Sequence, residues 1–164
     1  MKELTQVRDA VTTALAAAGL PALAAFPDQR AERYPGAVAA VSVGAAEGRA
    51  VGFCDYLGEV YDEAAGIWRE VYGKQLEGDI SLEIRAGRAA DCETGCETAS
   101  AVLLSGLPSG IRPGELRWEA IAWEKSTGMF LRRGALRCQA VFTAQTGEDG
   151  ETFLDFILKG VIRN

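Results

Sequence analysis

Apolar side chains recur at helical spacing in two segments of the chain. In residues 2–18 the apolar positions are Leu4, Val7, Val11, Ala14, Leu15 and Ala18. Gly19, followed by Pro21, is a strong signal that this helix ends there. In residues 89–105 the apolar positions are Ala90, Cys92, Cys96, Ala99, Val102 and Leu103. We therefore predict two helices, each packing one face on a core.

Strand patterns fill most of the remaining chain. Residues 79–87 alternate most clearly, and their apolar face carries Ile80, Leu82, Ile84 and Ala86. This period of two predicts an antiparallel strand with one buried face. We predict further strands at 37–44, 49–56, 115–124, 134–144 and 151–162, and a β-hairpin with its continuation over 57–88.

Glycine and proline clusters separate these elements. Residues 105–115 read SGLPSGIRPGE, which predicts an irregular connection. Asp149 followed by Gly150 is a good hairpin signal between the last two strands. The order is helix, strands, helix and three strands, with no internal repeat and no long linker. We predict one α+β domain over residues 1–164, with a largely antiparallel sheet and two helices packed on one face.

The charge of the chain is unevenly distributed along its length. The 164 residues carry a net charge of −6, and acidic chains lack the clustered Lys and Arg that nucleic-acid binding needs. We therefore expect no sequence-specific nucleic-acid partner. Residues 112–137 carry +3, which leaves −9 for the rest. This stretch is either a solvated sheet face or a basic strip that meets a complementary surface.

Histidine is absent from the sequence. Histidine titrates near neutral pH and is the commonest metal ligand, so Ser-His-Asp and Cys-His catalysis and most zinc sites are excluded on this chain. The sequence also contains no phosphate-binding loop, dinucleotide fingerprint, nucleophile elbow or calcium loop. We predict that the protein is not an enzyme and has no catalytic, cofactor-binding or metal-binding residues.

The four cysteines are Cys54, Cys92, Cys96 and Cys138. Their spacing is not that of a paired CxxC zinc site, and we expect reduced thiols buried in the core. The first residues lack the apolar stretch of a signal peptide, and no apolar run approaches the ~18 residues of a membrane span. We expect a protein that is made and folded in the cytoplasm, with no membrane partner.

The aromatic residues fall into two groups. Tyr56, Tyr61, Trp68 and Tyr72 cluster in the predicted hairpin region, and Trp118 and Trp123 lie five residues apart in one predicted strand. Regular alternation places these two tryptophans on opposite faces, so one of them leaves the core face. An exposed tryptophan indicates a second covering layer or a protein partner, unless a bulge restores its burial.

Two stretches of the sequence resemble a known family. They are residues 67–86 (IWREVYGKQLEGDISLEIRA) and residues 107–162, with the best-matched phrases at 69–73, 123–133 (WEKSTGMFLRR) and 153–160 (FLDFILKG). Both resemble the tail terminator, or tail completion, proteins of bacteriophages and prophages. These are characteristic phrases and not a chemical motif. The predicted element order also fits the α+β fold of that family.

The resemblance implies a structural role in the virion tail. Such proteins form a hexameric ring on the end of the tail tube, stop its polymerisation and offer a surface for head-tail joining. The implied partners are further copies of the chain, the tail tube protein, and a head-tail connector or sheath protein. Assembly then takes place in the cytoplasm of the host bacterium. The family has no catalytic residues to carry over.

A closed ring requires a head-to-tail interface between copies. We expect the hairpin at 61–72 to reach a neighbour or the tube, and the basic strip at 112–137 to face an acidic neighbour. The interface candidates are Tyr61, Trp68, Tyr72, Arg112, Arg117, Trp123, Arg132 and Arg133.

Two rival interpretations remain at this stage. The first is a head-tail connector, neck protein or other tail component, which binds portal rings instead of capping tubes. The second is a small-molecule-binding or enzymatic α+β domain. That reading predicts a deep pocket with convergent polar groups and perturbed carboxylates.

Overall fold

A computed structural model describes residues 2–25, 34–145 and 157–158 of the chain. Within these ranges the chain forms two helices and one mixed, mostly antiparallel sheet of eight strands. The elements in order are α1 (Lys2–Ala17), β1 (Ala22–Leu23), β2 (Val38–Ala50), β3 (Tyr56–Asp62), β4 (Ile67–Ala86), α2 (Ala89–Ser105), β5 (Ile111–Trp118), β6 (Ala122–Glu124), β7 (Met129–Gln145) and β8 (Ile157–Leu158). The predicted α+β class is confirmed, and both predicted helices are present.

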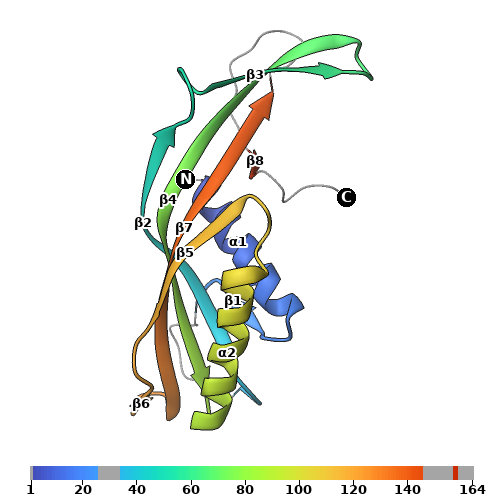
Figure 1. Ribbon diagram of the computed structural model, residues 1–164. Helices are drawn as coiled ribbons and strands as arrows, with labels where there is room; N and C mark the ends of the chain where they lie inside the picture. The colour runs from blue at the N-terminus through green and yellow to red at the C-terminus, as the bar shows by residue number, and fades with distance from the viewer. Residues whose placement is uncertain (1, 26–33, 146–156, 159–164) are drawn as a thin grey trace.

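Two long strands, β4 and β7, form the centre of the sheet. The strand order is β1-β2-β4-β7-β5, while β3 pairs with β4, and β6 and β8 pair with β7. Only β1 and β2 run parallel among these pairs. Both helices pack on the same face of the sheet, which we call the helix face (Figure 1). None of the described helices is long and apolar enough to cross a membrane.

The hydrophobic core lies between the helix face and the two helices. Even-numbered residues of β4 point into it, and the register places them opposite even-numbered residues of β7, for example Ile80 opposite Leu136. The largest fully buried side chains are Phe142, Leu15, Ile80, Leu82, Ile84, Leu103 and Leu136. We call this helix-covered part of the sheet, in which β4 contributes residues 73–86, the body.

The segment that joins β2 to β3 corrects one prediction. Residues 49–56 are not a separate strand, because β2 continues to Ala50 and residues 51–55 reverse the chain. Cys54 and Asp55 both have positive φ angles, 51° and 65°, and the Val51 amide donates to Asp55 Oδ1 at 3.1 Å. The reversal leaves Cys54 exposed, whereas the other three cysteines are buried as predicted. Burial raises the pKa of the Cys96 thiol to about 12.

The region from 105 to 124 corrects a second prediction. The strand predicted at 115–124 is two strands, β5 and β6, separated at residues 119–121. β5 also begins earlier than expected and includes Pro113 and Gly114, with a register shift between Pro113 and Leu116. Proline is tolerated here because β5 is an edge strand among the described elements.

The last third of the chain is only partly described. The strand predicted at 134–144 is confirmed and is longer, since β7 spans Met129–Gln145. Of the strand predicted at 151–162, only Ile157–Leu158 is described, and it pairs with β7. The predicted turn at Asp149 and Gly150, and most of the phrase at 153–160, lie outside the described residues.

Candidate protein-interaction surface

A two-stranded arm projects from one end of the sheet. It comprises residues 53–72, that is, the end of the reversal, β3, its turn and the outer end of β4. β7 reaches β4 only as far as Val71, and β2 only as far as Lys74. Beyond Val71, the described part of β4 therefore pairs only with β3. In Figure 1 the arm extends past both helices, at the end of the sheet far from β6.

The turn of the arm is held by Asp62. Its Oδ1 accepts hydrogen bonds from the amides of Ala64 and Ala65, at 3.0 and 3.1 Å. Its Oδ2 accepts one from Arg69 Nε at 2.7 Å, and Gly66 takes the positive φ that closes the turn. The Arg69 hydrogen bond and the backbone amides lower the pKa of Asp62. The arm is therefore a defined hairpin, with its shape set before any partner binds.

One face of the arm is aromatic. Tyr56 lies across from Tyr72 with ring centroids 5.7 Å apart, and Tyr61 lies across from Trp68 at 5.3 Å. Trp68 is 66% exposed. The structure thus brings together three residues that the sequence singled out, Tyr61, Trp68 and Tyr72. We call this surface the aromatic face of the arm.

The opposite face of the arm is aliphatic. Leu57, Val60 and Ile67 are exposed on the arm, and Leu57 lies over Gly73 so closely that a Cβ on that glycine would clash. Of the nine exposed large hydrophobic side chains among the described residues, seven belong to the arm. Phe53, at the reversal, is the most exposed of these, at 87%. Exposed apolar patches of this kind mark interaction sites in soluble proteins.

The sheet face opposite the helices is charged instead of apolar. Four arginines project from it on two neighbouring strands, namely Arg112 and Arg117 on β5 and Arg133 and Arg137 on β7. Arg133 donates to Glu83 and Arg137 to Glu77, both at 3.1 Å. In the second pair the arginine side chain is 62% exposed and the carboxylate only 16%. The carboxylates therefore lie beneath the guanidinium groups, and we call these four residues the arginine row.

Arg132 does not belong to this surface. It neighbours Arg133 on β7 and so points to the helix face, where its Nε donates to the Glu119 carbonyl at 2.7 Å. Its guanidinium carbon lies 5.9 Å from the centre of the Trp118 ring, and Trp118 in turn donates to Ser100 Oγ on α2. The strip at 112–137 is therefore divided between two faces of the sheet, because side chains alternate along a strand.

The two tryptophans also differ from expectation. Trp118 lies opposite Gly134 and Trp123 opposite Phe130, so both point to the helix face. The interruption at residues 119–121 breaks the alternation that predicted opposite faces. Trp118 is half-buried, while Trp123 packs edge-on against Phe130 at 4.9 Å and stays 55% exposed. Trp123 therefore remains an interface candidate, although it is far from the arm (Figure 1).

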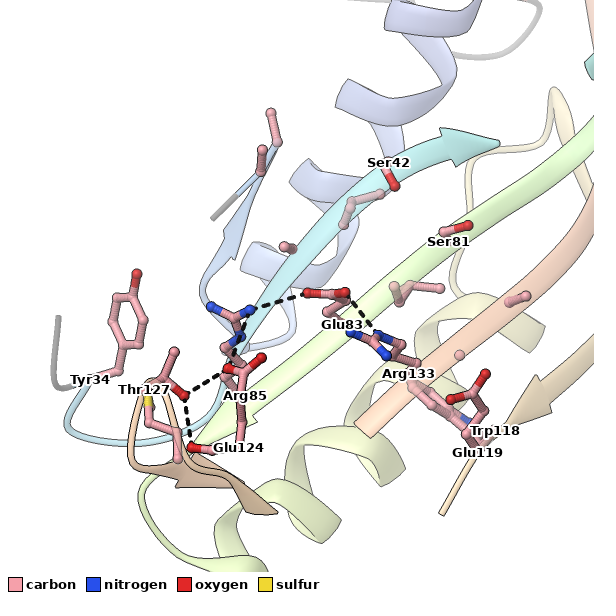
Figure 2. Close-up of a pocket in the computed structure, with 18 of the residues that line it drawn as sticks. Tyr34, Ser42, Ser81, Glu83, Arg85, Trp118, Glu119, Glu124, Thr127 and Arg133 are labelled. Atoms are coloured by element: carbon pink, nitrogen blue, oxygen red, sulfur yellow. Dashed lines mark hydrogen bonds and ion pairs between the residues drawn. The ribbon is translucent and has the colours of Figure 1, made fainter. Parts of the chain in front are cut away.

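A trough of about 1060 Å³ lies on the charged face near β6. Figure 2 shows a chain of ion pairs along it, in which Glu83 joins Arg85 at 3.5 Å to Arg133, and Arg85 joins Glu124 at 3.6 Å. Thr127 Oγ1 also lies 2.7 Å from Glu124. This is the kind of convergent polar cavity that the small-molecule reading predicts. Two of its three carboxylates, those of Glu83 and Glu124, are however engaged by arginine.

Comparisons with known proteins add no relative. No model of a protein family matches the sequence, and no curated protein matches it significantly. Within the described residues, no three Cys, Asp or Glu side chains are placed to hold a metal ion. The resemblance to tail terminators thus stays a prediction.

Sequence reasoning missed part of the arm. Phe53 falls in the segment at 49–56 that the sequence predicts as a separate strand, and Leu57 and Val60 fall in the predicted hairpin, where only the aromatic residues stand out as candidates. A signal was present, since residues 67–78 alternate imperfectly and the preceding stretch is apolar at both odd and even positions. A hairpin that has apolar side chains on both faces is typical of an element that other structure covers on both sides.

Proposed function

We propose that this chain is a structural protein of a bacteriophage or prophage tail, which caps the end of the tail tube as a ring. The ring ends tail polymerisation and provides the surface for head-tail joining. The observation that carries the proposal is the arm, an ordered hairpin with apolar side chains exposed on both faces. Such an element fits a protein that works by docking between others.

The arm suits a ring because its two faces can serve two contacts. A lone two-stranded hairpin is marginally stable in water. We therefore expect the arm to be more stable when a partner packs on each of its two faces. The arm lies at one end of the sheet and the charged face lies on the body, so they are two different surfaces of the molecule. Contact between them is head-to-tail, and such contacts close into rings when the rotation between copies permits.

The family resemblance supports the same assignment. Two of its best-matched phrases fall on described strands: residues 69–73 lie in the outer part of β4, and residues 123–133 cover β6 and the start of β7. The proposed partners are further copies of the chain in a hexamer, the tail tube protein, and a head-tail connector or sheath protein. Assembly in the host cytoplasm and a final place in the virion tail follow from this role.

Electron microscopy of the purified chain with growing tail tubes tests the proposal. We expect rings at tube ends and tubes that stop lengthening once the chain is added. Trp68→Ala is expected to reduce capping at least tenfold, since buried aromatic anchors dominate protein interfaces. Glu93→Ala, on the exposed side of α2, is the matched control and is expected to cap normally.

The result also separates the rival readings. Binding to portal rings without any effect on tube growth contradicts the terminator role and indicates a head-tail connector. Binding of a metabolite in the trough, with no effect on tubes or portals, contradicts the structural role altogether.

A further inference from the structure

A second exposed tryptophan, Trp123, lies at the end of the sheet that is far from the arm. Ala86 on β4, Phe130 on β7 and Trp123 on β6 are successive partners in the register, so they form one row across three strands. Trp123 packs edge-on against Phe130, with ring centroids 4.9 Å apart, and its side chain stays 55% exposed. The ring is therefore supported from within the chain and still presents a free surface. We call this corner of the sheet the β6 end.

The arm cannot reach the β6 end of its own molecule. From Trp68 to Ala86 the strand β4 runs eighteen residues, or roughly 60 Å at 3.3 Å per residue. Figure 1 shows the arm at one end of the sheet and β6 at the opposite end. A contact between these two surfaces therefore joins two copies of the chain. It is a head-to-tail contact, because the two surfaces differ.

The arm exposes enough apolar area for a stable contact. Its exposed aromatic side chains, which range from 40% to 87% exposure, are Phe53, Tyr56, Tyr61 and Trp68. An aromatic side chain buries roughly 150–250 Å², so these four together offer roughly 500 Å². A standard protein interface buries about 800 Å² on each partner. The aromatic residues of the arm alone therefore supply more than half of one partner's share.

Charged side chains beside the two tryptophans are complementary. On the arm, Glu59 and Glu63 are exposed, and at the β6 end Lys125 is exposed two residues after Trp123. Within the part of the chain that the structure describes, none of these three charged side chains has an ion pair or a hydrogen bond. An anionic arm and a cationic β6 end favour the pairing of unlike surfaces over the pairing of two arms.

We propose that the arm of one copy docks on the β6 end of a second copy, where Tyr61 and Trp68 pack against the free surface of Trp123. The inference rests on the proposed ring and identifies its contact. Lys125 of the receiving copy then lies beside the Glu59 carboxylate. Each copy gives its arm to one neighbour and its β6 end to the other, which closes a ring when the rotation between copies permits.

The charged face takes part in the same contact at its edge. The trough on that face is lined by Glu124 of β6 and by Arg133 of β7. An arm that is docked on the β6 end therefore borders the trough as well.

Two tryptophan variants, measured singly and as a mixture, test this pairing with the chain alone. Trp68→Ala damages the arm, and Trp123→Ala damages the β6 end. We expect each variant to weaken self-association, measured by analytical ultracentrifugation, by at least about 30-fold. In an equimolar mixture the intact arm of one variant meets the intact β6 end of the other. The mixture is expected to form dimers but no rings, because each pair then has a single working contact.

A charge exchange gives a second measurement that does not depend on the tryptophans. Glu59→Lys and Lys125→Glu each set like charges against each other, and we expect each to weaken association by about tenfold. The chain that carries both substitutions is expected to recover most of the wild-type association, because the pair is restored with its signs reversed.

The controls separate a lost contact from a lost fold. Leu104→Ala is the matched control, because Leu104 on α2 is also a large exposed apolar side chain of the body, and it is expected to associate like wild type. Circular dichroism and thermal unfolding show whether each variant is folded. If Trp123→Ala does not fold, the charge exchange decides the question alone.

Four outcomes overturn the inference. They are wild-type chain that stays monomeric up to about 1 mM, folded Trp123→Ala that associates like wild type, a tryptophan mixture that stays monomeric, and a double charge variant no better than the single ones. If Trp68→Ala still forms rings but no longer caps tubes, the arm contacts the tube, and the proposed function stands without this inference. If rings form through this contact but ignore tails and portals, the pairing stands and the proposed function fails.

Discussion

The strand β4 runs through two regions whose surfaces follow different rules. In the body, its side chains at Leu76, Ile80, Leu82, Ile84 and Ala86 are buried, and its odd-numbered side chains are mostly polar or charged. In the arm, the same strand exposes Trp68 on one face and Ile67 on the other. The body has a helical layer on one side and water on the other, while the arm has no second layer in the described structure.

The contrast shows that the apolar pattern of one strand can differ between its two ends, according to what packs against each end. A one-sided apolar pattern is satisfied within the chain, and the core of the body contains every large side chain that is fully buried. The two-sided apolar pattern of the arm is left exposed by the part of the chain that the structure describes. Burying a single large apolar side chain contributes about 1.5–3 kcal/mol, so covering the arm is expected to release a substantial free energy.

Truncation of one aromatic residue in each region is expected to give the largest difference between the body and the arm. Phe142→Ala removes the largest fully buried side chain of the body, and we expect a loss of about 3–5 kcal/mol in the free energy of unfolding. Trp68→Ala is expected to change it by no more than about 1 kcal/mol, since the ring is mostly exposed. Chemical denaturation of the monomer measures both. An equal loss in the two variants contradicts the division into body and arm.

The sequence predicts the body better than the arm. The helices at 2–18 and 89–105 and the alternating strand around Ile80 follow from periodicity alone, and the structure confirms them. The reversal at 51–55 has positive φ angles at Gly52, Cys54 and Asp55, and two of these three residues are not glycine, so glycine marks only part of it in the sequence. An exposed apolar arm also resembles a buried strand in sequence, because both are apolar and only the fold shows which one lacks a cover.

The candidate site shows the same limit. The aromatic cluster at Tyr61, Trp68 and Tyr72 was visible in the sequence, and the structure places these residues on one arm. The basic strip was visible as well, but its division between two faces depends on the alternation along β7. The faces on which Trp118 and Trp123 lie depend on the interruption at residues 119–121, and no residue type in that segment predicts it.

Charge reversal at two adjacent arginines tests that division. Arg132→Glu sets a carboxylate beside the Glu119 carbonyl under Trp118, and we expect a loss of about 2–3 kcal/mol in the free energy of unfolding. Arg133→Glu, on the charged face, gives up an exposed ion pair with Glu83, so its expected loss stays within about 1 kcal/mol.

The two variants therefore differ in kind as well as in size. Arg132→Glu is expected to weaken assembly only as far as it unfolds the chain, whereas Arg133→Glu is expected to weaken assembly in a folded protein. Thermal unfolding and ultracentrifugation on the same samples measure both. If the Arg132→Glu variant is stable and still fails to associate, Arg132 takes part in the interface.

The smallest expected effect is local to the turn of the arm. The pKa of Asp62 is lowered in the folded state, first by Arg69 and then by the turn amides. A carboxyl group with a depressed pKa stabilises the fold above its unfolded pKa, and that contribution is lost as the pH falls through the folded value. The turn is therefore expected to keep its structure at pH 5 and to loosen only below the ordinary Asp value of 3.8.

Hydrogen exchange at the Ala64 and Ala65 amides, which donate to Asp62, measures this effect directly. Protection of these amides is expected to fall in acid while protection in β4 of the body stays unchanged, because no core contact depends on the turn. Asp62→Asn keeps a hydrogen-bond acceptor but has no titrating carboxyl, so its protection is expected to be independent of pH between 5 and 3. Loss of protection in arm and body together shows instead that the two regions unfold as one unit, and that the arm is not an element held apart for a partner.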